Sequence, residues 1–157
     1  NDPHHLLTNR LNMDKLGAFG VSLGGVIVSE ASWEDRRIKA SLIMESPIPK
    51  KIAQTGLPVP TMVITRPAEA MRAERKKSGG WTESDIEQHL STMRALFENT
   101  AESEFVQIPD IFHVDFTDVP LWIPFAQQLG FSGSTPIEET HDKLNSLTLK
   151  FFEEYLQ

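Results

Sequence analysis

The sequence contains no cysteine and a single tyrosine among its 157 residues. The absence of cysteine excludes disulfide bonds, a thiolate nucleophile and a cysteine-based zinc site. No apolar run approaches the roughly 18 to 20 residues that cross a bilayer as a helix, so we expect no transmembrane segment. Basic residues are outnumbered, with 15 Lys and Arg against 22 Asp and Glu and a net charge of −7. Because binding to a nucleic-acid backbone requires clustered Lys and Arg, we expect no nucleic-acid partner.

The remaining composition is that of a globular protein, with 39% hydrophobic and 24% charged residues. Compact apolar runs alternate with segments of helical periodicity, which predicts an α/β fold with a mostly parallel sheet and helices on both faces. The predicted strands are 15–21, 38–44, 59–65 and 104–109. The predicted helices are 3–11, 23–32, a helix capped by Thr82 and Asp85 with the apolar stripe Ile86, Leu90, Met93 and Phe97, and 136–156 with Leu144, Leu147, Phe151 and Tyr155 on its buried face. Residues 76–80 are predicted to form a solvated turn.

The strand at 15–21 leads into Gly20-Val21-Ser22-Leu23-Gly24, a G-x-S-x-G pattern. In a nucleophile elbow the chain turns sharply from strand to helix, which strains the backbone at the serine and exposes its hydroxyl. We expect Gly20 and Gly24 to leave room for the close approach of strand and helix. The backbone N–H of Leu23 at the helix start is then a donor for an oxyanion. The pattern therefore predicts a nucleophilic Ser22, and the alternative is a structural turn.

A nucleophilic serine needs a general base, and the chain has five histidines. His113 follows the strand at 104–109 and comes after the serine in chain order, where hydrolases of this layered class place their histidine. The alternatives for it are a loop histidine bonded to backbone and a metal ligand with Asp115 and Asp118. We expect the others at the surface: His4, His5, His89 paired with Asp85, and His141.

The orienting acid is expected at the carboxyl end of a strand between the serine and the histidine. Glu45 ends the strand at 38–44, and Glu69 follows the strand at 59–65. Position alone leaves both open, and Glu69 could instead be a charge that starts a helix.

Together these segments resemble the platelet-activating-factor acetylhydrolase family, a branch of the α/β-hydrolases that includes lipase-like esterases. The matching stretches are 13–25, 37–45, 60–64 and 113–121. The resemblance implies that Ser22 is the nucleophile, His113 the base and Glu45 the acid. Two departures are Glu45, where the family has Asp, and Val21, where it usually has His.

The resemblance implies an acyl-enzyme mechanism on a short-acyl or phospholipid-like ester, with no metal or organic cofactor. The segment 119–125 is strongly apolar, and we expect its Trp122 and Phe125 to bind substrate, the alternative being ordinary core. The family favours a secreted enzyme of lipid degradation, with a cytoplasmic location as the alternative. The competing function is a catalytically inactive, hydrolase-like binding module.

An α/β-hydrolase has several strands before its elbow, whereas here the elbow lies at residue 22. We therefore expect residues 1–157 to be the C-terminal portion of one hydrolase domain. The N-terminal strands are expected on a separate chain or a cleaved segment, which would be the partner of this chain.

Overall fold

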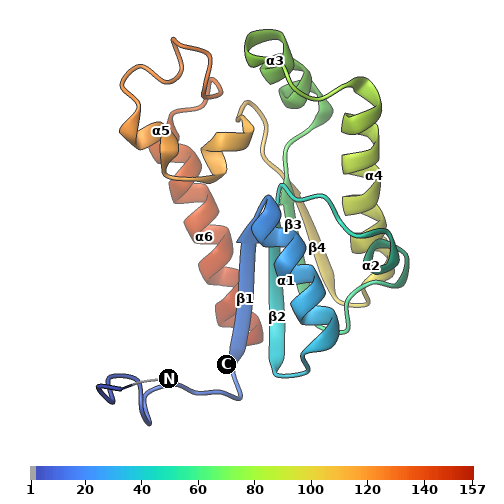
Figure 1. The fold of residues 1–157 in the computed structure, drawn as a ribbon, viewed down its shortest axis with the longest axis vertical. Coiled ribbons are helices and arrows are strands. Elements are labelled where there is room, and N and C mark those ends of the chain that lie inside the picture. The colour runs from blue at the N-terminus through green and yellow to red at the C-terminus, as the bar shows by residue number, and fades with distance from the viewer. Residues whose placement is uncertain (1–2) are drawn as a thin grey trace.

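A computed structural model describes residues 3–157, and its centre is a sheet of four parallel strands in the order β1-β2-β3-β4 (Figure 1). The strands are β1 (Leu16–Val21), β2 (Ile38–Met44), β3 (Thr61–Thr65) and β4 (Ser103–Gln107). Parallel pairing brings all four carboxyl ends to one edge of the sheet, and the elbow and both candidate acids follow strands there. The predicted α/β class with a parallel sheet is confirmed.

Within residues 3–157, seven helical segments connect and cover the strands. They are α1 (Leu23–Glu34), α2 (Lys50–Thr55), α3 (Ala68–Ser78), α4 (Glu83–Asn99), the 3-10 turn η1 (His113–Phe116), α5 (Val119–Trp122) and α6 (Ile137–Tyr155). Between residues 3 and 157 no helix combines the length and hydropathy of a membrane span.

The sheet has an apolar cluster on each face, because the side chains of a strand alternate between faces. On one face Leu42 and Met62 pack against Phe151 of α6. On the other face Ile43 and Val63 pack against α1, α2 and α4. Helices therefore cover both faces, as the sequence predicts, and the two central strands are nearly fully buried.

Two local expectations are wrong, and two helices are not predicted by the sequence. The segment 3–11 forms turns rather than a helix. Residues 76–78 belong to α3, which the sequence did not predict because it is rich in charge and buries only Ala70 and Met71. The short α2 was missed for the same reason, since it buries only Ile52 and Ala53. In contrast, the Thr82–Asp85 capping box at the start of α4 is present as predicted.

Strand β1 lies at one end of the sheet and pairs within the described residues with β2 alone. Its neighbourhood is apolar and open to solvent: Phe19 on the strand is 62% exposed, and Ile27 on α1 is also 62% exposed. An unpaired strand edge flanked by exposed apolar side chains favours pairing with another polypeptide segment.

Candidate active site

Ser22 lies between β1 and α1 in a strained conformation, with φ 54° and ψ −121°. A positive φ is uncommon for a residue with a side chain and costs roughly 1–3 kcal/mol. The backbone N–H of Ser22 donates to the carbonyl of Met44 at 3.0 Å, which fixes the turn to the end of β2. The predicted sharp strand-to-helix turn is therefore present, with the serine at its apex.

At two of the three glycines near Ser22, a residue with a Cβ would collide with neighbouring atoms. A Cβ on Gly20 would collide with the backbone of Gly24, and a Cβ on Gly25 would lie 2.5 Å from the Cβ of Ser46. A Cβ on Gly24 would meet open space, so the expectation that Gly24 makes room is wrong. Gly25 instead allows α1 to approach the loop that follows β2.

The oxyanion donor expected from Leu23 has the required position in the chain. Leu23 is the first residue of α1, so its backbone N–H has no acceptor within the helix. Its side chain is 70% exposed, which leaves this turn of the helix open at the surface. A helix N-terminus with a free N–H is suited to stabilise developing negative charge.

Glu45 directly follows β2, is completely buried and has φ 44°. Its Oε2 accepts hydrogen bonds from Thr65 Oγ1 at 2.8 Å and from the backbone N–H of Arg66 at 3.2 Å. Its Oε1 accepts from Arg66 Nε at 2.7 Å, and both side chains of this ion pair are inaccessible to solvent. Three donors thus hold the Glu45 carboxyl group at the carboxyl edge of the sheet.

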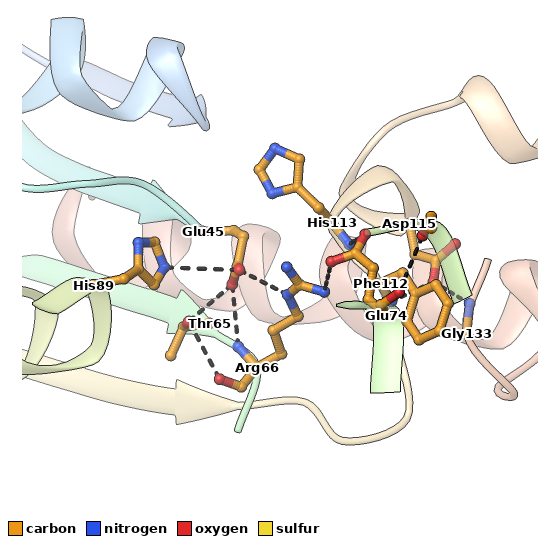
Figure 2. Close-up of polar contacts among 10 residues, drawn as sticks. Glu45, Thr65, Arg66, Glu74, His89, Phe112, His113, Asp115 and Gly133 are labelled. Atoms are coloured by element: carbon orange, nitrogen blue, oxygen red, sulfur yellow. Dashed lines mark hydrogen bonds and ion pairs between the residues drawn. The ribbon is translucent and has the colours of Figure 1, made fainter. Parts of the chain in front are cut away.

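The ion pair continues through Arg66 to α3 and η1 (Figure 2). Arg66 Nη1 donates to Glu74 Oε2 at 2.5 Å, and the other oxygen of Glu74 accepts from the backbone N–H of His113 at 3.2 Å. Sequence reasoning missed both Arg66 and Glu74. The available signal was a charged residue directly after the apolar β3, where the end of a buried strand leaves a charge to be paired.

His113 begins η1 at the same edge of the sheet, but its ring makes no hydrogen bond with Ser22 or Glu45 in the described part of the chain. Its Nδ1 is buried and has no hydrogen-bond partner among residues 3–157. Figure 2 shows that the imidazole ring of His113 points away from the Glu45–Arg66 ion pair. The structure therefore places the three predicted triad members on neighbouring connections without joining them by hydrogen bonds.

Glu69, the alternative acid, has a different environment. Its side chain is 80% exposed and lies 3.7 Å from Arg72 across one turn of α3. It occupies the first turn of that helix, where a negative charge is favourable. The structure gives it no hydrogen bond to His113 within the described residues.

The expectation that His89 lies at the surface beside Asp85 is wrong. His89 is 3% exposed, its Nε2 lies 3.7 Å from Glu45 Oε1, and its ring meets Trp81 edge-on at 5.0 Å between centroids. Burial is the main reason that the pKa of His89 is lowered; Arg66 and His113 lower it further, while Glu45 opposes them. Of the predicted apolar stripe of α4, Ile86 and Met93 are buried as expected, whereas Leu90 and Phe97 are half-buried and the other buried positions are His89 and Leu96.

The alternative that His113 binds a metal with Asp115 and Asp118 is not supported by the positions of these side chains. Asp115 is buried, and its Oδ2 accepts backbone N–H groups of Phe112 at 2.6 Å and Gly133 at 2.8 Å. Across residues 3–157, no three His, Cys, Asp or Glu side chains gather as a metal site would require. Asp115 therefore anchors the loop that carries His113.

The other expected site residues lie as follows. Trp122 and Phe125 are 76% and 74% exposed, which excludes the core alternative for both and leaves them available for contact with a ligand. His4 and His5 are exposed as expected. His141 was expected to be exposed, but it is half-buried, and its Nε2 lies 3.2 Å from the carbonyl oxygen of Thr117.

The chain matches no family model and no curated protein sequence. Among solved structures it is similar to a ferulic acid esterase from Streptomyces cinnamoneus, with a TM-score of 0.68 and 22% sequence identity. The similarity covers 93% of this chain and 42% of that esterase, so the chain spans less than half of the esterase's length. Together with the parallel sheet, this likeness shows an α/β-hydrolase-like fold.

Proposed function

We propose that this protein contributes the catalytic centre of a serine carboxylic-ester hydrolase. The observation that carries the proposal is the strained Ser22, with φ 54° and ψ −121° at the turn from β1 to α1. Backbone strain of this size persists when the surrounding structure holds it, and it is concentrated at functional sites. A hydroxyl at a strand-to-helix turn with a free N–H beside it is the arrangement that acyl transfer requires.

In the proposed reaction Ser22 Oγ attacks the ester carbonyl while His113 accepts its proton. The carbonyl oxygen becomes an oxyanion, which the N–H of Leu23 stabilises, and collapse releases the alcohol with the proton from His113. Water, deprotonated by His113, then attacks the acyl-enzyme and frees the acid. Catalytic hydrogen bonds are often long without substrate, so the separated rings and oxygens in this structure are compatible with the scheme.

Two similarities support the choice of substrate class. One solved structure of similar fold is a ferulic acid esterase, which favours ester hydrolysis. The sequence resemblance to platelet-activating-factor acetylhydrolases favours a short-acyl or phospholipid-like ester, and it also favours secretion. The exposed Trp122 and Phe125 on and just after α5 are available to meet an apolar substrate or a lipid surface.

The nucleophile is tested by Ser22→Ala and by a fluorophosphonate probe. We expect the wild-type protein to hydrolyse short-chain p-nitrophenyl esters, the variant to lose at least about a thousandfold in kcat/KM, and the probe to label Ser22. Ser32→Ala is the matched control, because Ser32 is a buried serine within α1 whose hydroxyl pairs with Ser41, and it should retain both labelling and activity. Equal slow hydrolysis by wild type and Ser22→Ala would reject the proposal.

The acid is tested by comparing Glu45→Gln with Glu69→Gln. If Glu45 orients the imidazole, Glu45→Gln should lower kcat by about a thousandfold or more, whereas Glu69→Gln should have little effect. Circular dichroism must show that Glu45→Gln is folded, because this substitution leaves the buried Arg66 with Glu74 as its one carboxylate partner among the described residues. A large loss in Glu69→Gln alone would assign the acid to α3.

A second candidate function is a catalytically inactive binding module. It is favoured by one observation, namely that both oxygens of Glu45 are engaged by Thr65 and Arg66 instead of His113. In such a module Ser22 would keep its strained conformation, but the protein would not hydrolyse esters. The fluorophosphonate experiment separates the two, since an inactive module would leave Ser22 unlabelled.

We also propose a partner polypeptide that supplies further strands of the same hydrolase. Its support is the unpaired edge of β1 with its exposed apolar surroundings, and the fact that the similar esterase is more than twice as long as the matched region. Co-purification of a second polypeptide on denaturing electrophoresis would support this partner. A monodisperse and fully active 17.7 kDa monomer would exclude it.

A further inference from the structure

The chain of ion pairs at the sheet edge ends on the backbone of the candidate base. Arg66 Nη1 donates to Glu74 Oε2 at 2.5 Å, and Glu74 Oε1 accepts from the backbone N–H of His113 at 3.2 Å (Figure 2). Glu74 belongs to α3 and precedes His113 by 39 residues. The Glu74 carboxyl group therefore joins two elements that are distant in the sequence.

The backbone N–H of His113 needs an acceptor from outside its own turn. His113 is the first residue of η1, and the first N–H groups of a helical turn have no acceptor within it. Glu74 supplies that acceptor from a side chain that is only 13% exposed, so water has little access to compete for the hydrogen bond. The start of η1 is thus fixed to α3.

The loop that carries His113 is held by a second carboxyl group on its other side. Asp115 Oδ2 accepts from the backbone N–H groups of Phe112 and Gly133, which ties the loop to residue 133. Glu74 instead ties the loop to Arg66 and, through Arg66, to Glu45. The backbone on both sides of the His113 Cα is therefore anchored, although the ring Nδ1 has no hydrogen-bond partner among residues 3–157.

In a serine hydrolase the acid orients the base by accepting a hydrogen bond from the imidazole ring. In this structure Glu45 accepts from Thr65 and Arg66, and its hydrogen-bonded connection to His113 runs through Arg66 and Glu74. We propose that Glu74 is a positioning residue, which together with Arg66 links Glu45 to the backbone of His113 where a triad would link the acid to the ring. Its effect on catalysis rests on the proposed hydrolase function, whereas the anchoring of His113 does not.

The expected consequence is a loss of rate without a loss of substrate affinity. A misplacement of a catalytic group by about 1 Å costs on the order of a hundredfold in rate. Both oxygens of Glu74 are already engaged by Arg66 and His113, so Glu74 has no group to spare for a substrate. Removal of its carboxyl group should therefore lower kcat and leave KM nearly unchanged.

The test compares Glu74→Ala with Met71→Ala in the full chain. Met71 is completely buried on the same helix, so Met71→Ala weakens the attachment of α3 without touching His113 by a hydrogen bond. We expect Glu74→Ala to lower kcat on short-chain p-nitrophenyl esters about tenfold to a hundredfold, with KM within about twofold of the wild-type value. Met71→Ala should keep kcat near the wild-type value.

Amide hydrogen exchange measures the anchor itself, without any substrate. The protection of the His113 amide is divided by that of the Phe112 amide, which Asp115 holds in every variant. Glu74→Ala should lower this ratio about tenfold or more, whereas Met71→Ala, which weakens both amides alike, should leave it unchanged. The ratio thus separates the release of His113 from a general loss of stability.

Glu74→Gln is the conservative variant, since its single carbonyl oxygen must serve the two donors that Glu74 serves with two oxygens. We expect kcat and the protection ratio to fall together in the order wild type, Glu74→Gln, Glu74→Ala. If Glu74→Ala fails to fold, Glu74→Gln still decides the question, because it has nearly the same shape as the native side chain.

An unchanged kcat or an unchanged protection ratio in the Glu74 variants would overturn the proposal. An equal loss of kcat in Met71→Ala would also overturn it, because Glu74 would then act only by attaching α3. A protein in which Glu74→Ala releases the His113 amide, but which hydrolyses no ester in its wild-type form, would retain the anchor and reject the hydrolase function.

Discussion

The Glu45 side chain has no contact with solvent, so the free-energy cost of burying it depends on the groups that surround it. Thr65, Arg66 and the Arg66 backbone donate to its two oxygens, and His89 lies at 3.7 Å. A charge in such a place is tolerated only when it is paired and hydrogen-bonded. The same surroundings determine the protonation of His89, which is kept neutral by burial.

The neutral His89 predicts a pH dependence of stability. Its pKa in the folded protein lies below the ordinary value of 6.5, mainly because of burial and despite Glu45. Between these two pKa values the unfolded chain binds a proton that the folded protein does not, so the unfolding free energy falls as pH decreases below 6.5. Above pH 6.5 this contribution is fully present.

Urea unfolding at pH 7, 6 and 5 measures this effect. We expect His89→Phe to lose less stability than the wild type between pH 7 and 5, because the titrating ring is gone. His4→Phe is the control, since His4 is exposed and its removal should leave the pH profile unchanged. Parallel profiles for wild type and His89→Phe would contradict the prediction.

At the scale of elements, the buried ions join parts of the fold that share few apolar contacts. Glu45 follows β2, Arg66 follows β3, Glu74 belongs to α3, and η1 is tied to Glu74 by the backbone of His113. Helix α3 buries only Ala70 and Met71, so this chain of ion pairs is a principal attachment of α3 to the sheet edge.

Arg66→Met should therefore destabilise the protein strongly. It leaves Glu45 buried without its counter-ion, which costs about 3–5 kcal/mol, whereas the double variant Glu45→Leu with Arg66→Met should recover most of that loss. Arg72→Met is the matched control: Arg72 pairs with Glu83 at the surface, where ion pairs contribute little, so its loss should lower the unfolding free energy far less than Arg66→Met does. Chemical denaturation measures all three, and an equal cost for Arg66→Met and Arg72→Met would refute the argument.

The elements could be predicted from the sequence where burial is strong and periodic. Residues 38–44 were predicted as a strand and β2 has those bounds, because an apolar run stopped by Ser46-Pro47 leaves little ambiguity. Polar helices such as α3 carry no such signal. The candidate site follows the same division. Ser22 is marked by a local motif, whereas the partners of Glu45 come from the end of β3 and from α4, which are distant in sequence and are brought to Glu45 by tertiary packing.

At the scale of the whole molecule, the unpaired edge of β1 is the feature that bears on assembly. Phe19, Leu23 and Ile27 are each more than 60% exposed along this strand and the helix that follows it. Exposed apolar surface beside free backbone hydrogen-bonding groups favours association. The edge is suited to receive the strands of the proposed partner.

Without that partner we expect the chain to self-associate through this edge. Phe19→Lys should weaken the association about tenfold or more, because it removes a large apolar side chain and adds a charge that disfavours edge pairing. Sedimentation velocity over a range of concentrations measures the effect. Trp122→Lys, at a site 76% exposed on α5, is the control and should associate as the wild type does. The expectation fails if the wild-type chain stays monomeric throughout.

The C-terminal end of α6 lies beside the start of β1. A Cβ on Gly17 of β1 would lie 2.8 Å from Leu156, and Figure 1 shows the end of α6 beside the start of β1. A polypeptide fused after α6 would thus emerge next to the same sheet edge as one fused before β1. Circular permutation, or a complementing segment tethered at either end, could therefore deliver additional strands to β1 through a short linker.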